Sequence, residues 1–209
     1  MRRLTHLAPL GLALLLAACG DAESLLPPDA VLPDGGRYRG EVVDGLLQGS
    51  GRLDYRDGSW FAGAFKDGQL HGAGEWRGAQ GEHYLGDFRF GVFHGQGSLR
   101  QGDDSRYQGG FVDGRFAGEG TLKHAGQVYR GEFKRGLFDG AGHLEWADGS
   151  SYQGQFRRGQ PHGQGVRRDA YGNSFSGEFV RGQLHDPRVR VVSFTGSTGV
   201  GRKLLEQCA

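Results

Sequence analysis

The sequence predicts an all-β protein, built as a single layer of antiparallel β-hairpins that repeat along the chain and end in a short C-terminal cap. Glycine makes up 41 of the 209 residues, where an average chain has roughly 7%. Glycine inside a helix costs about 1 kcal/mol relative to alanine, so this composition excludes a helical bundle. The chain also carries 13 Phe, 7 Tyr and 3 Trp, which argues against disorder. Collagen is excluded because glycine does not recur at every third residue.

The first 18 residues have the pattern of an export signal. Arg2 and Arg3 form a short basic start, and residues 7–18 are apolar or small without any charge. A membrane-spanning helix needs about 20 apolar residues, so this segment is too short to span a bilayer. It fits the hydrophobic core of a signal peptide.

The signal ends in Leu16-Ala17-Ala18-Cys19-Gly20, which resembles the lipobox of bacterial lipoproteins. The resemblance implies cleavage before Cys19 and acylation of its thiol and new amine. Several acyl chains would hold the protein firmly on a membrane. Gly20 stands where lipoproteins retained in the inner membrane typically carry Asp, so the outer membrane, facing the periplasm, is favoured. Asp21 leaves the inner membrane open, and the alternative is an ordinary cleaved signal with an unrelated cysteine.

Residues 19–36 are expected to form a lipidated cysteine and an extended tether. Pro27, Pro28 and Pro33 break regular structure and favour an extended path. If Cys19 carries lipid, Cys208 has no partner within the chain. It is then either a free thiol or an incidental terminal residue.

Residues 37–186 contain one unit copied seven times. An aromatic residue starts each copy, and the steps between starts are 23, 23, 23, 22, 23 and 23 residues. Glycine follows each start at +2 and +7, and Phe follows at +4 in every copy but the first, which has Val42. The expected repeat core therefore comprises Tyr38, Phe61, Phe65, Tyr84, Phe88, Tyr107, Phe111, Tyr129, Phe133, Tyr152, Phe156, Phe175 and Phe179.

The spacing within one copy predicts a hairpin. Offsets 0, +2 and +4 lie on one face of a strand, because side chains alternate with period 2. The glycine at +7 often follows Asp, as in Asp44-Gly45, and predicts a turn. In six copies the second strand carries glycines at +11 and +13, which we expect to leave space for the rings of neighbouring strands. Asp57-Gly58 and Asp148-Gly149 would turn the chain into the next copy.

A single hairpin cannot bury its own rings, so stacked copies should form a solenoid with nearest-neighbour stability. The pattern Tyr-x-Gly-x-Phe-x-x-Gly-x-x-His-Gly-x-Gly at 84–97 resembles the MORN repeat. MORN arrays in other proteins act as interaction, dimerisation or lipid-contacting modules. Residues 187–209 are expected to form the cap, with residues 188–194 as a last strand and 202–207 as a short helix.

Histidines recur at offset +10, as His71, His94, His162 and His185. Adjacent copies lie two strands, about 10 Å, apart, whereas ligands lie about 2 Å from a shared metal ion. These histidines are therefore interpreted as packing or turn residues, and no metal site is predicted.

The sequence gives no signal for a cofactor or a catalytic site. The six Gly-x-Gly pairs lack the third glycine of a dinucleotide fingerprint. Residues 196–204 resemble a phosphate-binding loop, but no Lys directly follows its second glycine. Because no catalytic motif is present either, we predict no cofactor, no catalytic residue and no enzymatic activity.

Charge is unevenly distributed along the chain. Residues 20–150 carry 14 basic and 20 acidic side chains, whereas residues 151–209 carry 9 basic and 4 acidic ones. Such asymmetry indicates either contact with an acidic surface or simple drift in composition. Mixed signs along the polar strand face argue against nucleic acid. The candidate residues for anionic contact are Arg157, Arg158, Arg167, Arg168, Arg181, Arg188 and Arg190.

These observations predict a membrane-anchored, non-enzymatic lipoprotein of the bacterial cell envelope that acts as a protein-binding or scaffolding module. Its partner would be another protein or a second copy of the chain. One alternative is contact with anionic phospholipid or glycan through the arginine-rich end. Another is an envelope hydrolase, which would need paired carboxylates in a cleft.

Overall fold

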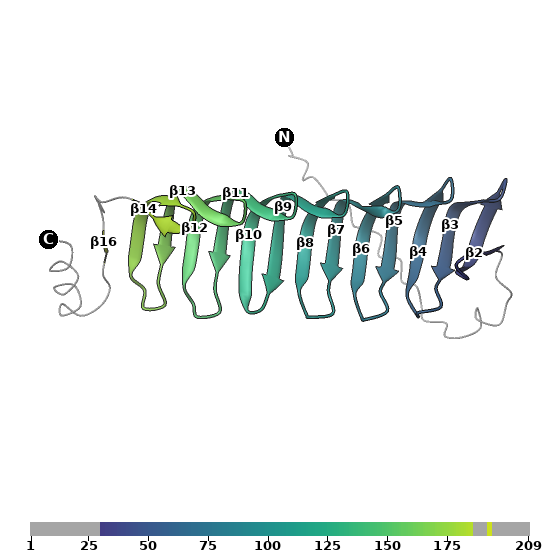
Figure 1. Ribbon diagram of the computed structural model, residues 1–209, viewed down its shortest axis with the longest axis horizontal. Coiled ribbons are helices and arrows are strands. Elements are labelled where there is room, and N and C mark those ends of the chain that lie inside the picture. Colours follow the sequence, from purple (N-terminus) through teal and green to yellow (C-terminus); the bar gives the residue numbers. More distant parts are fainter. Residues whose placement is uncertain (1–29, 186–191, 194–209) are drawn as a thin grey trace, which may run out of the picture.

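The computed structural model describes residues 30–185 and 192–193, which form one antiparallel sheet of sixteen strands (Figure 1). The strands follow one another in chain order from β1 to β15, and β16 pairs with β14. None of the described residues forms a helix, so none lies in a helix long and apolar enough to span a membrane. The predicted all-β hairpin array is therefore confirmed.

Each copy contributes one shorter and one longer strand. The shorter strands are β2 (Arg37–Val43), β4 (Trp60–Lys66), β6 (His83–Arg89), β8 (Arg106–Val112), β10 (Gln127–Lys134), β12 (Ser151–Arg157) and β14 (Ser174–Val180). The longer strands are β3 (Leu46–Asp54), β5 (Gln69–Arg77), β7 (Val92–Arg100), β9 (Arg115–His124), β11 (Leu137–Glu145) and β13 (Gln160–Arg168). The remaining strands, β1 (Ala30–Val31), β15 (Gln183–Leu184) and β16 (Val192–Ser193), lie at the ends of the array.

Two-residue turns join the strands within each copy. In the first copy, Asp44 and Gly45 connect β2 to β3 with φ of 50° and 78°. Positive φ at both positions is the mark of the type I′ turn, which matches the twist of a hairpin and suits Asp-Gly. The turns predicted at offset +7 are thus confirmed, and together they form what we call the turn edge of the sheet.

Five-residue loops join most copies at the opposite, loop edge. Tyr55 donates its amide to Ser59, and Gly58 closes the turn with φ of 85°. The 22-residue copy has a tighter connection, in which Ala125 and Gly126 form a two-residue turn with φ of 48° and 77°. The missing residue is therefore lost from a loop, and the strand pairing is unaffected.

An unbroken row of glycines crosses the sheet. Each strand from β2 to β14 contributes one glycine, and each glycine is paired with the next across the ladder: Gly40, Gly51, Gly63, Gly74, Gly86, Gly97, Gly109, Gly120, Gly131, Gly142, Gly154, Gly165 and Gly177. A Cβ on Gly120 would lie 2.5 Å from the hydroxyl oxygen of Tyr107. The glycines at +13 thus make room for the rings, as expected.

The glycines at +11 have a different role from the one predicted for them. Gly118 has φ of 67°, and a Cβ there would meet no atom within 4 Å. The ladder register shifts between Gly109 and Phe111 in this copy. The +11 glycine is therefore required by the backbone of a β-bulge, which commonly takes a left-handed glycine.

The rings form a continuous chain of edge-on contacts. Tyr107 contacts Phe111 of its own copy and Phe133 of the next copy, both with ring centroids 5.1 Å apart. Edge-to-face pairs at 4.5–7 Å are favourable beyond the area that they bury. Twelve of the thirteen expected core residues are buried, and Phe175 in the last copy is half-buried.

Additional short strands lie at both ends of the array. Ala30 and Val31 pair with Tyr38 and Arg37, so the end of the segment expected to be an extended tether joins the sheet. At the other end, β16 pairs with Ser174 and Phe175 of β14. The remainder of the expected cap, including the helix at 202–207, lies outside the described residues.

Candidate functional site: an aromatic groove with a basic rim

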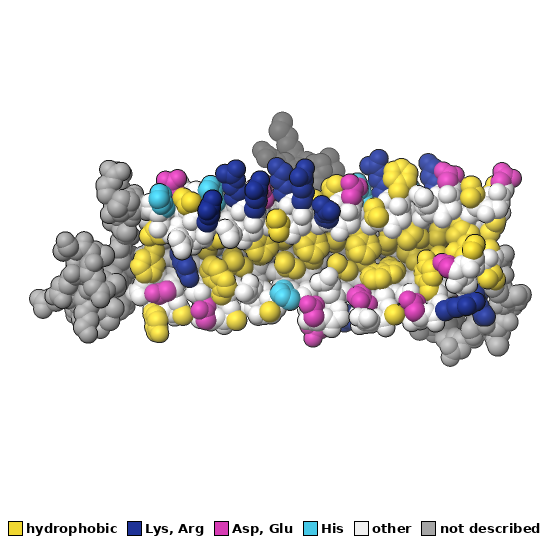
Figure 2. Space-filling model, in the orientation of Figure 1, with side chains coloured by type: hydrophobic (Ala, Val, Ile, Leu, Met, Phe, Trp, Pro, Cys, Tyr) yellow, Lys and Arg dark blue, Asp and Glu magenta, His cyan; other side chains and the backbone are white. Residues whose placement is uncertain are grey.

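A strip of half-buried apolar side chains lies along the ring-bearing face of the array. Phe93, Phe116 and Phe138 stack on Tyr84, Tyr107 and Tyr129 with centroids 3.7–3.8 Å apart and planes within 12°. Figure 2 shows the resulting apolar band, which runs the length of the array between two polar margins. We call this strip and the pockets along it the aromatic groove.

Sequence reasoning missed the residues that line this groove. They occupy offset +9, which is apolar in every copy: Leu47, Leu70, Phe93, Phe116, Phe138, Pro161 and Leu184. This regular apolar position in the sequence could have been used to predict the groove. The three phenylalanines fall in the third, fourth and fifth copies, so the aromatic part of the groove lies in the middle of the array.

The tyrosine hydroxyls fix the rings to the bulges. The hydroxyl of Tyr107 donates to the carbonyl of Gly110 at 2.9 Å, and that of Tyr129 donates to Glu132 at the same distance. Burial raises the pKa of the Tyr107 hydroxyl to about 12, and it raises the pKa of Tyr84 and Tyr129 as well. These groups therefore stay protonated as donors, with a structural role.

The turn edge forms one margin of the groove. From the second copy on, the amide of the turn glycine donates to the +9 carbonyl of the preceding copy, as Gly136 does to Phe116 at 2.9 Å. These bonds hold each turn beside the groove residue of its neighbour. Any side chain on a turn is thereby brought next to the aromatic strip.

The charge of the turns reverses along the array. The residue before the turn glycine is Asp44, Asp67 or Asp113 in three of the first four copies, and Phe90 in the other. In the last three copies it is Arg135, Arg158 and Arg181. The arginines have φ of 55°, 51° and 51°, so they adopt the same left-handed conformation as the aspartates.

The basic rim is the set of exposed cations along this part of the turn edge: Arg115, Lys134, Arg135, Arg157, Arg158 and Arg181. None of the six forms an ion pair with the described acidic residues. The Asp139 carboxylate instead accepts the backbone amide of Arg158 at 3.3 Å. Figure 2 shows cations gathered along this margin of the band.

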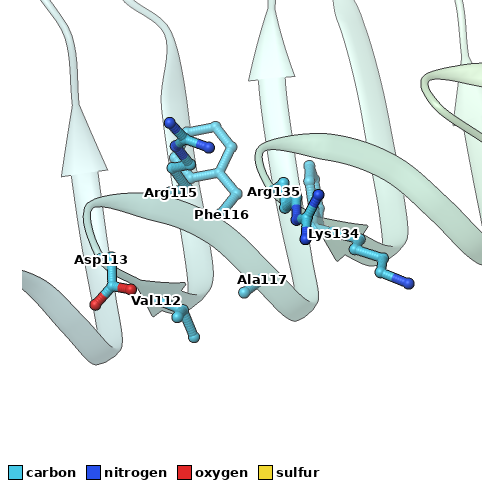
Figure 3. Close-up of a pocket in the computed structure, with 8 residues that line it drawn as sticks. Val112, Asp113, Arg115, Phe116, Ala117, Lys134 and Arg135 are labelled. Carbon is cyan, nitrogen blue, oxygen red and sulfur yellow. The ribbon is translucent and has the colours of Figure 1, made fainter.

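Two adjoining pockets connect the rim to the groove. The first, of about 530 Å³, is lined by Phe116 and Phe133 together with Arg115, Lys134 and Arg135. Figure 3 shows Arg115 and Arg135 extending to the same side of the ribbon from neighbouring copies. The second pocket, of about 760 Å³, continues past Lys134 and Arg135 to Phe156, Arg157 and Arg158. Each pocket also includes one carboxylate, from Asp113 and Asp139 respectively.

The arginines predicted for anionic contact do not gather in one place. Arg157, Arg158 and Arg181 lie on the basic rim. Arg167 and Arg168 lie at the other end of β13, toward the loop edge, where Arg167 sits 5.6 Å from the centroid of the Trp146 ring. Arg188 and Arg190 lie outside the described residues. Arg115, Lys134 and Arg135 were not among the predicted residues, because they precede residue 150, in the part of the chain whose net charge is acidic.

The +10 histidines do not come together, in line with their interpretation as packing or turn residues. The His71 ring lies 6.0 Å from that of Phe90, and His94 Nδ1 lies 3.9 Å from Asp113. Within the described part of the chain, no three His, Cys, Asp or Glu side chains are grouped closely enough to hold a metal ion.

One cluster has the residue types of a hydrolytic triad. The Ser105 hydroxyl contacts Nδ1 of His124, and Asp103 Oδ2 lies 3.6 Å from the same nitrogen. A relay needs serine and aspartate on different ring nitrogens, so this arrangement cannot transfer a proton as a triad does. Ser105 matches Ser59 and Ser150, whose hydroxyls donate to Asp57 and Asp148 within their loops. The cluster is therefore a turn.

The fold and the open groove define an elongated repeat module of the protein-binding or membrane-associated type. The MORN repeat family matches residues 38–60, 61–83, 84–106, 107–126, 129–151 and 152–173. The chain therefore belongs to the MORN-repeat family. Six copies are matched, and the seventh is present in the structure as β14 and the two-residue β15.

Among solved structures, the chain is similar to the TCP domain of SAS-4 from Drosophila melanogaster, determined in complex with a proline-rich motif of Ana2. The two are 14% identical, with a TM-score of 0.41 over 73% of this chain and 83% of that one. A comparison with curated proteins found no match.

Proposed function

We propose that this protein is a lipid-anchored scaffolding module of the bacterial cell envelope, and that its aromatic groove binds an extended segment of a partner protein. The partner is either a different protein or a second copy of the chain. The module acts by binding and catalyses no reaction. The observation that carries the proposal is the strip of half-buried Phe93, Phe116 and Phe138 along an open face.

The shape of the groove supports a long, thin partner. Its pockets lie between successive copies and adjoin one another, so a ligand can contact several copies at once. Aromatic rings that are already stacked lose little freedom on binding, which favours them as anchors. Repetition of the same contact adds avidity without requiring one deep cavity.

The anchor is proposed from the lipobox-like segment that ends in Cys19. The test compares the parent protein with the Cys19→Ser variant. It measures the electrophoretic mobility of each protein, its labelling with a fatty acid, and its distribution between membrane fractions. We expect loss of acyl labelling and release of the protein from the outer-membrane fraction. Unchanged labelling and fractionation would contradict the anchor while leaving the groove proposal intact.

The binding role is tested by photo-crosslinking in living cells. A crosslinking amino acid replaces Phe116 in the groove, and the control places it at Gln108, which is exposed on the opposite face of β8. We expect a discrete adduct from position 116 and none from position 108. An adduct the size of two chains would identify a second copy as partner. No adduct, or the same adducts from both positions, would contradict the proposal.

A further inference from the structure

We propose that the segment bound in the aromatic groove is acidic, and that the basic rim binds its carboxylates across the fourth to seventh copies. This inference rests on the proposed function and names the chemical class of its partner. It predicts an extended polypeptide in which apolar side chains contact the phenylalanines and Asp or Glu side chains contact the rim.

The first support is the absence of ion pairs within the described residues. Arg39, Arg52 and Arg130 pair with Asp54 or Glu145 elsewhere on the sheet. The six rim cations form no such pair. The two pockets beside them contain only the carboxylates of Asp113 and Asp139, so the rim keeps an excess of positive charge that an anion from outside this part of the chain would neutralise.

The second support is backbone strain at the same positions. Left-handed backbone is unfavourable for an ordinary residue, whereas Asp and Asn adopt it readily. Arg135, Arg158 and Arg181 nevertheless occupy the position that Asp44, Asp67 and Asp113 occupy in earlier copies. Strained residues of this kind cluster at functional sites. The turn itself would be better served by aspartate, so its chemistry does not explain the arginines.

The third support is the spacing of the copies. Two strands per copy give a repeat of about 9.6 Å. A polyproline II segment has three residues per turn and advances about 3.1 Å per residue, so every third side chain points the same way at intervals of about 9.3 Å. A peptide that runs along the groove therefore meets a new copy at every third residue. Carboxylates at that interval would lie opposite the cation pairs Lys134-Arg135 and Arg157-Arg158.

The opposite margin favours a polypeptide over a membrane surface. The loop edge carries the exposed carboxylates of Asp103, Asp104 and Asp148, and Figure 2 shows acidic side chains along that margin of the same face. A flat anionic bilayer that reached the basic rim across this face would also approach those acids. A chain lying beside the rim would not.

The test measures binding of labelled peptides to the purified full chain by fluorescence anisotropy. The first probe is (Glu-Leu-Gln)₄, and its neutral counterpart is (Gln-Leu-Gln)₄. A third peptide has the composition of the first, with Glu at two-residue spacing. Vesicles of phosphatidylglycerol and phosphatidylcholine test the membrane alternative.

The key variant is Arg135→Asn with Arg158→Asn, which removes two rim charges and keeps residues suited to the turns. The matched control, Arg100→Gln with Arg106→Gln, removes two exposed arginines that are paired across β7 and β8 near the loop edge. Exposed ion pairs contribute modestly, and the rim variant loses two of them, so we expect it to bind the first probe roughly tenfold more weakly. The control should bind it within about twofold of the parent.

The proposal requires tighter binding of the acidic probe than of the neutral one, a preference for three-residue spacing, and weakening by added salt. Equal binding of both peptides, or equal loss in the rim and control variants, would overturn it. Vesicle binding that depends on the rim without peptide binding would overturn it in favour of a lipid surface. An adduct from position 116 alongside any of these outcomes would leave the proposed function standing.

Discussion

The glycine row makes one substitution especially informative, namely Gly120→Ala. Gly120 has ordinary strand geometry, so alanine fits its backbone. Its new methyl group would lie 2.5 Å from the hydroxyl oxygen of Tyr107 and 2.8 Å from two ring carbons. Contacts under 3.0 Å cannot persist, so the ring must leave its site.

The expected cost follows from what the Tyr107 ring does there. Its burial is worth about 2–3 kcal/mol, and its hydrogen bond to Gly110 is worth about 1 kcal/mol. It also makes two edge-on contacts with Phe111 and Phe133 and one stacked contact with Phe116, at roughly 0.5–1.5 kcal/mol each. Allowing for contacts that the displaced ring retains, we expect Gly120→Ala to lower the free energy of unfolding by about 4 kcal/mol.

Gly118→Ala on the same strand is the matched control. Its methyl group would meet nothing within 4 Å, and its cost is only the left-handed backbone, about 1–2 kcal/mol. Urea denaturation followed by circular dichroism gives both values, and amide exchange should show lost protection centred on β8 and β9. In a Tyr107→Ala background, Gly120→Ala should cost nearly nothing. Equal costs for the two glycines, or additivity with Tyr107→Ala, would refute the reasoning.

Three further predictions can be measured on the same protein. Tyr129→Phe should cost about 1 kcal/mol by urea denaturation, since it removes the hydroxyl donor to Glu132, and no change would show that this bond contributes nothing. The contribution of Tyr107 to stability should be constant up to about pH 10, the ordinary tyrosine pKa, and should be lost above it, because the folded state holds the proton of Tyr107 to about pH 12. Tyrosinate absorbance that rises near pH 10 without loss of structure would contradict this. Deletion of 187–209 should lower the thermal midpoint, because β16 covers part of β14, and an unchanged midpoint would argue against a cap.

Most of the fold could be predicted from the sequence because its determinants are local and repeated. The aromatic, glycine and turn positions each recur at a fixed offset in every copy. Because the same pattern appears seven times, it cannot have arisen by chance. The +11 glycines were misinterpreted because a sequence does not distinguish glycine required for space from glycine required for φ. Only the φ of 67° at Gly118, beside the ordinary strand geometry of Gly120, separates the two roles.

The candidate site was harder to predict because it depends on which edge of the sheet a residue reaches. Arg158 and Arg168 are only ten residues apart in the sequence and both belong to the basic segment 151–209. They nevertheless lie at opposite ends of the hairpin, Arg158 at the turn edge and Arg168 toward the loop edge. Lys134 and Arg135 lie in the fifth copy, within residues 20–150, where acidic side chains outnumber basic ones. Assigning charges by their offset within the copy would have found the basic rim.

The 22-residue copy shows where this architecture accepts changes in chain length. One residue was removed between His124 and Gln127, and the ladder on both sides continued in register. The turn edge has less freedom, because the two-residue turns of the second to seventh copies also bond the copy before them. New loops or whole domains could therefore be inserted at the loop edge while the turn edge stayed unchanged. The loop edge is thus the place where both evolution and protein engineering can change the chain length.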